Sequence, residues 1–267
     1  IDAAGFGTLF HRAAQLAYLD LTAHTATVRK EDLEALLRAE ERLKGYVDRA
    51  FKEEFFKIDL NEKAEYNGMQ LITARVIVSY LKQLLRNDLA YVPFDMVAME
   101  KRVYEVVTVN IAGQPVKLRL GGIIDRMDSK EGTLRIVDYK TGGSEQTLSS
   151  MDELFANDGK RKGYIFQTFL YAAIICRQQE SEAHQQQVAP ALLYIHQASQ
   201  EDHSPVIKMG EPRKEKLPIT HFALLEDEFR DRLQELLAEI FDPNEPFTQT
   251  EDLKKCEYCD FKSVCKR

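Results

Sequence analysis

Three successive β-strands are predicted in the central part of the chain, and their connections limit the possible architectures. Residues 96–111 are rich in β-branched and aromatic side chains, which favour a strand. An Ala-Gly-Gln-Pro turn at 112–115 leads to a second strand over 116–128. A tight connection at 129–132 leads to a third strand over 133–141. Strands joined by turns this short are antiparallel neighbours in one sheet.

Helices are predicted on both sides of these strands. Within the first ninety residues apolar side chains recur at helical spacing, and a helix expected over 70–91 ends where Pro93 breaks the pattern. After the third strand, the sequence predicts a helix over 163–178, a buried strand over 191–196 and an amphipathic helix over 222–241. This order predicts a mixed α/β sheet flanked by helices, in one domain with a cysteine-bearing tail.

The second and third strands each deliver an aspartate to the same edge of the sheet. Side chains alternate along a strand, so Asp138 and Lys140 share a face with the apolar Ile136. The second strand reaches Asp125 directly after a buried Gly-Gly-Ile-Ile run. Because the two strands are neighbours, Asp125 and Asp138 are expected to lie side by side.

A pair of adjacent aspartates predicts a metal site. The two carboxylates repel each other unless a cation lies between them, and oxygen ligands suit Mg²⁺ or Mn²⁺, which also take phosphate oxygens. Lys140 can orient an attacking water or stabilise charge that develops on phosphorus. These groups suit hydrolysis of a phosphodiester. The alternative is an exposed Asp–Lys pair at a strand end, because D-x-K occurs often by chance.

Three ordered motifs resemble those of the PD-(D/E)XK nuclease superfamily. They are GIIDR at 122–126, DYKTG at 138–142, and a Q-x-x-x-Y pair formed by Gln167 and Tyr171. The RecB-like branch is the more similar; it includes the nuclease domains of RecB and AddB and the CRISPR-associated exonucleases. That branch also has a G-x-x-x-H pattern on an N-terminal helix, which residues 7–11 match. The resemblance spans residues 7 to 265 in the family's order and spacing.

The resemblance implies a fold and a set of site residues. The fold would be a restriction-endonuclease-like core, a mixed central sheet flanked by helices, with an N-terminal helical region. Asp125 and Asp138 would be metal ligands, with the backbone carbonyl of Tyr139 as a third oxygen. His11 would add a nitrogen ligand, and Lys140 would be the catalytic lysine.

Two of the implied site residues lie on a later helix. Gln167 and Tyr171 are one helical turn apart on one face and would contact the site or the DNA backbone. The alternative is a helix whose residues serve only core packing. The basic run 160–162 precedes this helix, where a DNA backbone would pass; a solvated helix entrance explains it equally well.

His11 and Glu100 each have an alternative interpretation as ordinary structural residues. Without the family match, His11 is a helix histidine packed by Ala14 and Tyr18. Glu100 matches a glutamate often found before the sheet in the RecB-like branch, where it would face substrate or support the ligands. Glu100 could equally be a solvated strand residue that pairs with Lys101 or Arg102.

The C-terminal cysteines predict a second metal site. Cys256, Cys259 and Cys265 form a C-x₂-C-x₅-C pattern among lysines, and this chemistry suits zinc or [4Fe–4S] equally. AddB-like nucleases carry the same spacing, and there it holds a [4Fe–4S] cluster with a fourth cysteine far upstream. By this resemblance the fourth ligand is expected upstream of residue 1. The chain is then expected to be a piece of a longer protein, with the cluster complete only in the full-length protein. Cys176 is expected to be a core residue, and a zinc knuckle that uses His221 is the weaker alternative.

Composition limits the classes of function and the domain count. The 267 residues carry a net charge of −7, which argues mildly against a nucleic-acid ligand, so that function must rest on a site. No apolar run is long enough to span a bilayer, and a bacterial-type cytoplasmic location is expected. We expect a nuclease domain over 1–247, with a helical part at 1–92 and a sheet core at 93–247, and an iron–sulfur-type tail over 248–267.

The sequence therefore predicts a metal-dependent DNA exonuclease domain of the AddB type, acting on double-strand-break ends for recombinational repair. By this resemblance its partners would be DNA and a helicase–nuclease subunit. No G-x-x-x-x-G-K-[ST] loop occurs in these residues, so the helicase motor would lie upstream or in a partner. The alternatives are a non-catalytic DNA-end-binding module with the same fold and a stand-alone CRISPR-type exonuclease. The retained charges of Asp125, Asp138 and Lys140 count against the non-catalytic module.

Overall fold

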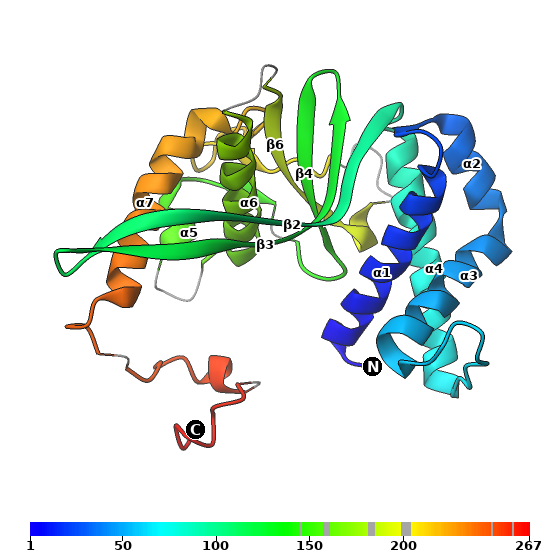
Figure 1. Ribbon diagram of the computed structural model, residues 1–267, viewed down its shortest axis with the longest axis horizontal. Coiled ribbons are helices and arrows are strands. Elements are labelled where there is room, and N and C mark those ends of the chain that lie inside the picture. The colour runs from blue at the N-terminus through cyan, green and yellow to red at the C-terminus, as the bar shows by residue number, and fades with distance from the viewer. Residues whose placement is uncertain (145, 157–160, 181–184, 199–203, 247, 258) are drawn as a thin grey trace.

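A five-stranded mixed sheet lies at the centre of the computed structural model (Figure 1). Its strand order is β1-β2-β3-β4-β6, with β4 and β6 parallel and the other neighbours antiparallel. The strands are β1 (Thr27–Val28), β2 (Phe94–Ile111), β3 (Gln114–Lys130), β4 (Thr133–Lys140) and β6 (Gln187–Tyr194). The structure describes residues 1–144, 146–156, 161–180, 185–198, 204–246, 248–257 and 259–267. The predicted α/β class, consistent with a restriction-endonuclease-like core, is confirmed.

Strands β2 and β3 form one long hairpin that extends beyond the rest of the sheet. They pair from Asp95–Ser129 to Ile111–Gln114, and their two-residue turn has positive φ at Ala112 (49°) and Gly113 (82°). Two left-handed residues suit the right-handed twist of a hairpin. The hairpin arches across α6 (Gly163–Gln179) and α7 (Ala223–Phe241) (Figure 1).

Helices cover both faces of the sheet. The N-terminal group is α1 (Ala3–Leu21), α2 (Lys30–Arg38), α3 (Glu40–Ala50), which a π-helical segment at Phe51–Phe56 continues, and α4 (Gly68–Leu89). The second group consists of a short α5 (Asp152–Phe155) with α6 and α7. None of the described helices is long and apolar enough to cross a membrane. The helices predicted over 70–91, 163–178 and 222–241 are confirmed to within two residues at each end.

Three features differ from the sequence-based expectation or go beyond it. The predicted strand 191–196 begins earlier, at Gln187, and ends at Tyr194, because residues 195–197 form a 3₁₀ turn. The two-residue strand β1 and a small sheet of β5 (Thr147–Leu148), β7 (Lys208–Met209) and β8 (Leu217–Pro218) are too short to show periodicity. The predicted tail boundary, residue 247, lies outside the described residues.

The two faces of β4 belong to two separate hydrophobic cores. Leu134 and Ile136 pack into the core beneath α6 and α7. Val137 and Tyr139 pack into the core formed with α1, α3 and α4. The period-2 alternation predicted for this strand is therefore confirmed, and it assigns one face of the strand to each group of helices.

A buried ion network joins the sheet to the N-terminal helices. The Arg126 guanidinium, on β3, lies 2.6 Å from Asp88 of α4 and 2.6 Å from Asp128. Arg135 of β4 contacts the other Asp128 oxygen at 2.7 Å, and the Tyr18 hydroxyl of α1 donates to Asp88. Arg126 and Asp128 are completely buried, so each charge depends on its partners.

Burial by itself would raise the pKa of the Asp128 carboxyl, but the guanidinium groups of Arg126 and Arg135 outweigh burial and lower that pKa. The unfolded chain therefore binds a proton at a pH where the folded protein does not. The contribution of Asp128 to stability is present above the ordinary aspartate pKa of 3.8 and is lost as the pH falls through the lower folded value.

We predict that Asp128→Asn lowers the free energy of unfolding by about 3–5 kcal/mol, because it leaves buried guanidinium charge without its partner. Urea unfolding at neutral pH measures the change. The exposed Asp231→Asn on α7 is the matched control and should change stability by less than about 0.5 kcal/mol. Equal stability of the two variants would contradict a supporting role for the network.

Candidate metal centre

Glu100 and Asp125 lie opposite each other where β2 and β3 reverse their faces. The neighbours of Glu100 pair with the neighbours of Asp125. Along β3, Ile124 and Met127 both enter the core beneath α6 although they are three residues apart, so the alternation breaks between them. On β2 the break falls at Glu100, whose φ of 50° lies in the left-handed region. This irregularity places two carboxylates at one point of the sheet.

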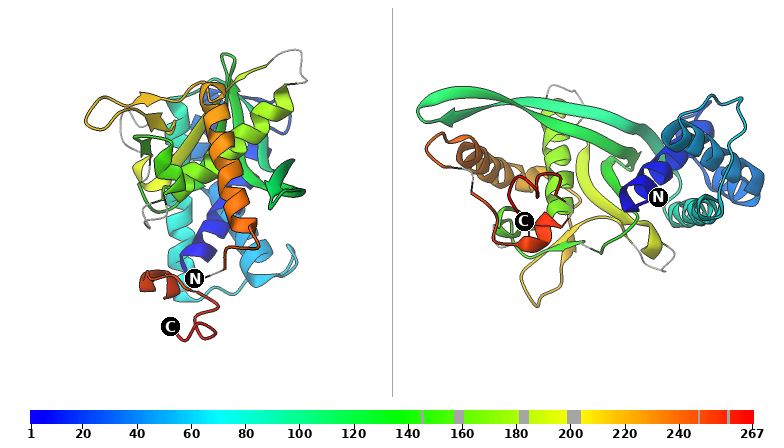
Figure 2. Two further views of the ribbon diagram at one scale, coloured as in Figure 1. Left: turned by 90° about the vertical axis from the view of Figure 1, so that its left-hand side faces the viewer. Right: turned by 90° about the horizontal axis from the view of Figure 1, so that it is seen from below.

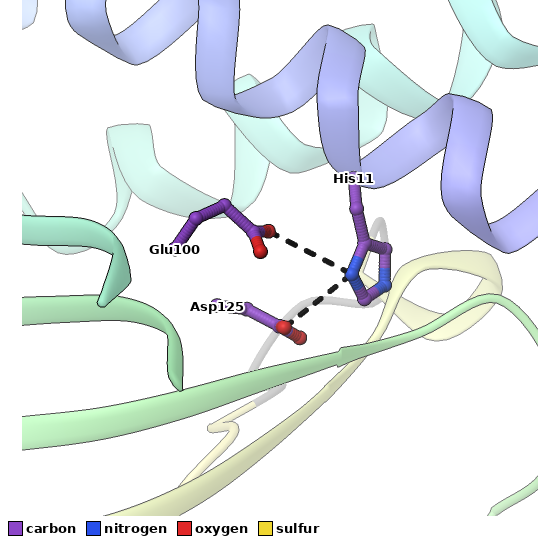
Figure 3. A group of neighbouring side chains, drawn as sticks. All are labelled: His11, Glu100 and Asp125. Carbon is purple, nitrogen blue, oxygen red and sulfur yellow. Dashed lines mark ion pairs between the residues drawn. The ribbon is translucent and has the colours of Figure 1, made fainter. Parts of the chain in front are cut away.

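His11 of α1 lies against both carboxylates (Figure 3). Its Nδ1 atom is 3.4 Å from Asp125 Oδ1 and 3.9 Å from Glu100 Oε1. Its Nε2 atom is 3.2 Å from the backbone oxygen of Tyr139. One potential ligand atom from each of His11, Glu100 and Asp125 lies within 4.8 Å of the others, a grouping that no other His, Cys, Asp or Glu side chains form in the described part of the chain. The predicted ligands His11 and Asp125 are thus brought together.

Asp125 also ends the pairing between β3 and β4. The ladder stops at Arg126 and Val137, one position before Asp125 and Asp138 would meet. In place of a strand carbonyl, the Asp125 carboxylate accepts a hydrogen bond of 2.7 Å from the backbone N–H of Tyr139. The strands separate here. Asp125 and Asp138 are both buried, but Asp138 is not part of the close group that His11, Glu100 and Asp125 form in the described part of the chain.

Lys140 pairs with Asp138 at the end of β4. Its Nζ atom is 2.6 Å from Asp138 Oδ2 and lies 4.4 Å from the centre of the Tyr164 ring on α6. The Lys140 side chain is 16% exposed and the Asp138 side chain 5%, so this is a largely buried pair and not an exposed one at a strand end. The alternative of a solvated Asp–Lys pair is therefore wrong in its geometry.

Glu100 and Asp138 hold protons more tightly than ordinary carboxyls. Burial, followed by the charge of Asp125, raises the pKa of Glu100 to about 7 and that of Asp138 to about 6. Burial opposes charging of His11, but the nearby carboxylates, Asp125 foremost, outweigh it and raise the His11 pKa. The site therefore concentrates negative charge in a poorly solvated place.

The donor set fits a hard divalent cation. The buried Glu100 Oε1 atom accepts no hydrogen bond, and Asp138 Oδ2 has only the ion pair with Lys140. Carboxylate oxygens, a backbone carbonyl at Tyr139 and one imidazole are groups that such a cation accepts. A cation here would relieve the repulsion between the carboxylates and use their unsatisfied oxygens.

Gln167 and Tyr171 lie on one face of α6, as their spacing predicts. The Gln167 side-chain amide donates a hydrogen bond of 3.1 Å to the Tyr171 hydroxyl. A Cβ atom on Gly122 would come within 2.4 Å of that hydroxyl, so the tyrosine lies directly on the β3 backbone three residues before Asp125. Only glycine leaves room for this contact.

The basic run before α6 lies at a helix entrance. Arg161 donates to the backbone oxygen of Ala156 at 3.2 Å, and Lys162 lies 3.7 Å from Glu153. Residue 160 lies outside the described residues. These local partners agree with the alternative of a solvated helix entrance. A contact of this run with the DNA backbone stays a prediction.

The tail cysteines are free and half-buried. Cys256, Cys259 and Cys265 follow α7, in a segment that includes a 3₁₀ turn at Leu253–Cys256. Within the described residues their sulfur atoms do not form a group as close as the one around His11. Cys176 packs against the core beneath α6, and burial together with Glu226 raises its pKa to about 12, which fits the expected core residue.

Comparison with known protein families matches residues 1–266 to the PD-(D/E)XK nuclease superfamily. The chain belongs to this superfamily, whose members are typically nucleases and generally use divalent metals. A nuclease binds nucleic acid, so the negative net charge is no argument against that ligand. Comparison with curated proteins gave no match.

Glu100 is the site residue that sequence reasoning left undecided. Its side chain does not pair with Lys101 in solvent, because it points toward His11 and is 26% exposed. The register opposite Asp125 follows from the turn at residues 112–113, and counting back from that turn finds the pair. The left-handed φ of Glu100 has no sequence signal, since a glutamate rarely adopts it.

The raised pKa of Glu100 predicts a pH effect on metal-free stability. Between its ordinary value of 4.5 and about 7, the folded protein keeps a proton that the unfolded chain releases. Stability should therefore fall as the pH rises through this window, and Glu100→Gln should make the fall shallower. Thermal melts in chelator at a series of pH values measure the slope, with the exposed Glu235→Gln on α7 as control. An unchanged slope in Glu100→Gln would refute the assignment.

Proposed function

We propose that this chain is a metal-dependent DNA exonuclease domain of the RecB-like branch, most similar to that of AddB-type subunits. The observation that carries the proposal is the convergence of His11, Glu100 and Asp125 beside the buried pair of Asp138 and Lys140. A purely structural role leaves this group unexplained, because buried like charges without a cation cost stability.

Mg²⁺ or Mn²⁺ would be held by Asp125, Asp138, the Tyr139 carbonyl and His11, with Glu100 as a further oxygen donor. A bound divalent cation supplies Lewis-acid stabilisation of phosphate oxygens. The hydrogen bond from the Tyr139 N–H orients the Asp125 carboxylate, and the backbone oxygen of Tyr139 orients the His11 ring.

Lys140 would act on the phosphate that undergoes cleavage. Asp138 and the Tyr164 ring keep its ammonium group at the end of β4. From there it would stabilise the negative charge that develops on phosphorus or orient the attacking water. Gln167 and Tyr171 would contact the DNA backbone or the site from α6, and the Tyr171 hydroxyl over Gly122 supports this position.

The proposed biological setting is the processing of broken DNA ends for recombinational repair. Its support is the order of the motifs from His11 to Tyr171 together with the C-terminal cysteine spacing, which resembles that of AddB. The domain would act with a helicase–nuclease partner subunit in the cytoplasm of a bacterium. The nuclease part would extend to residue 247, and the cysteine-rich tail would follow it.

We predict that the chain degrades linear DNA in Mg²⁺ or Mn²⁺ and that chelator stops the reaction. Asp125→Asn and Lys140→Ala should each lower the rate by about a hundredfold or more, because each removes a group that acts on the transition state. Release of acid-soluble nucleotides measures the rate, and the exposed Asp231→Asn should retain it.

Two outcomes of that assay would be informative. Equal rates for the wild type and Asp125→Asn would exclude catalysis at this site and favour the end-binding alternative. Closed circular DNA should survive, since an exonuclease needs a DNA end. Cutting of the circle would show a nuclease that does not need an end and would contradict the exonuclease assignment.

We further propose that Cys256, Cys259 and Cys265 supply three of the four cysteine ligands of a [4Fe–4S] cluster. The three thiols provide three cysteine ligands of the kind that such clusters use, while Cys176 is held on α6 by core packing.

We predict that anaerobic incubation with iron and sulfide gives a broad visible absorbance and bound iron. The absorbance should be lost in Cys256→Ser and retained in Cys176→Ser, because Cys176 lies in the core. A colourless protein that binds zinc under the same conditions would contradict the iron–sulfur assignment and favour the zinc knuckle.

A further inference from the structure

The outward face of the β2–β3 hairpin has an unusual composition. Alternate residues of both strands point away from α6 and α7, from Arg102 to Asn110 on β2 and from Lys117 to Ile123 on β3. All of these residues lie in the described part of the chain, and none is acidic. Three are basic, namely Arg102, Lys117 and Arg119, in a chain whose net charge is −7. The face therefore attracts anions although the protein as a whole repels them.

An aromatic ring lies among these basic residues. Tyr104 is 55% exposed, and the Arg119 guanidinium is 3.9 Å from its ring centre. Its cross-strand partner is Gly121, where a Cβ would come within 2.1 Å of the Val103 backbone oxygen, so the glycine lets the two strands approach closely beside the tyrosine. The Arg119 cation covers part of the ring. A large aromatic side chain in this position is not required by the core, which lies on the other face.

Two neighbouring depressions lie between this ring and the candidate metal centre. A depression of about 420 Å³ is lined by Tyr104, Arg119 and the two adjacent glycines. It shares Arg102 and Ile123 with a second depression of about 400 Å³, which His11 and Glu100 line. Glu54 is the other acid in the second depression, and Lys57 lies 3.1 Å from it. Basic and aromatic groups therefore line the depression next to the one that contains the candidate metal ligands His11 and Glu100.

The opposite face of the hairpin is held in place. Glu105 on this inner face is 3.0 Å from Arg230 of α7, and Val103 and Val109 are buried in the core beneath α6. The views in Figure 2 show α6 and α7 on one side of the hairpin, with its other side turned away from the molecule. The outward face is thus a rigid surface and not a loose arm.

We propose that this outward face binds the single strand of DNA that leads into the metal centre. The nature of the ligand rests on the proposed function. Phosphates would contact Arg102, Arg119 and Lys117, and one base would stack on Tyr104. A stacked ring requires a base that is free of its complement, and the combination of cationic groove and stacking platform is the chemistry that recognises single strands. Duplex ends would have to be opened before they reach this surface.

The test is fluorescence anisotropy of a labelled oligothymidylate in chelator, where no cleavage occurs. Tyr104→Leu should weaken binding about fivefold or more, since base stacking contributes about 1–3 kcal/mol, while Tyr104→Phe should bind within about twofold of wild type. The double variant Lys117→Ala/Arg119→Ala should reduce the slope of log affinity against log salt by about 1.4, because each lost phosphate contact accounts for about 0.7. Arg38→Ala on α2 is the control for a lost exposed arginine away from the hairpin.

Each result decides a separate point. Unchanged affinity in Tyr104→Leu, or a blunt duplex bound as tightly as the single strand, would overturn the proposal. Binding with the expected dependences by a protein that cleaves nothing would retain this surface and reject the proposed catalysis. Cleavage that is intact in wild type, together with no effect of the hairpin variants on affinity, would retain the nuclease and reject this surface. Circular dichroism of the variants excludes misfolding, which exposed positions should not cause.

Discussion

The buried guanidinium of Arg126 is the interaction on which the candidate site depends. It follows Asp125 directly on β3 and faces Asp88 of α4, while Tyr18 of α1 also donates to Asp88. Because α1 carries His11, the network that holds α1 against the sheet also sets the distance between His11 and Asp125. A charge buried this completely tolerates little displacement, since every lost partner leaves an uncompensated ion. The network therefore gives the site a rigid support.

The site itself is built from an irregularity of the sheet, a few residues from the register shift between Met96 and Ala98. At Glu100 and Asp125 both strands change faces, and β3 separates from β4 where the Asp125 carboxylate takes a hydrogen bond from Tyr139. Regular pleating would send these acids to solvent or into an apolar core. The irregularity instead gathers acids whose pKa values are raised by burial and by each other, Glu100 to about 7 and Asp138 to about 6. Such an arrangement is expensive without a cation and favourable with one.

Local patterns were sufficient to predict much of this. Alternation along β4 predicted that Asp138 lies on the same face as Ile136. The short turn after Asp128 predicted that β3 and β4 are neighbouring strands, which places Asp125 near Asp138. The i, i+4 spacing put Gln167 and Tyr171 on one helix face. The short strands could not be predicted, because two residues are too few to show an alternating pattern. The position of Glu100 could not be predicted either, because its left-handed backbone conformation arises from the surrounding contacts and not from the preference of a glutamate.

The sequence by itself determined the class of fold, the superfamily and the acids, lysine and histidine of the candidate site, because these follow from periodicity, turn length and ordered motifs. Only the tertiary structure decided that Glu100 joins His11 and Asp125, that Lys140 is buried against Asp138, and that the basic face of the hairpin leads to them. The physical reason is that these relations depend on strand register, on the reversal of the sheet and on the packing of α1. Each of them joins residues that are far apart in the chain, where local preference has no influence.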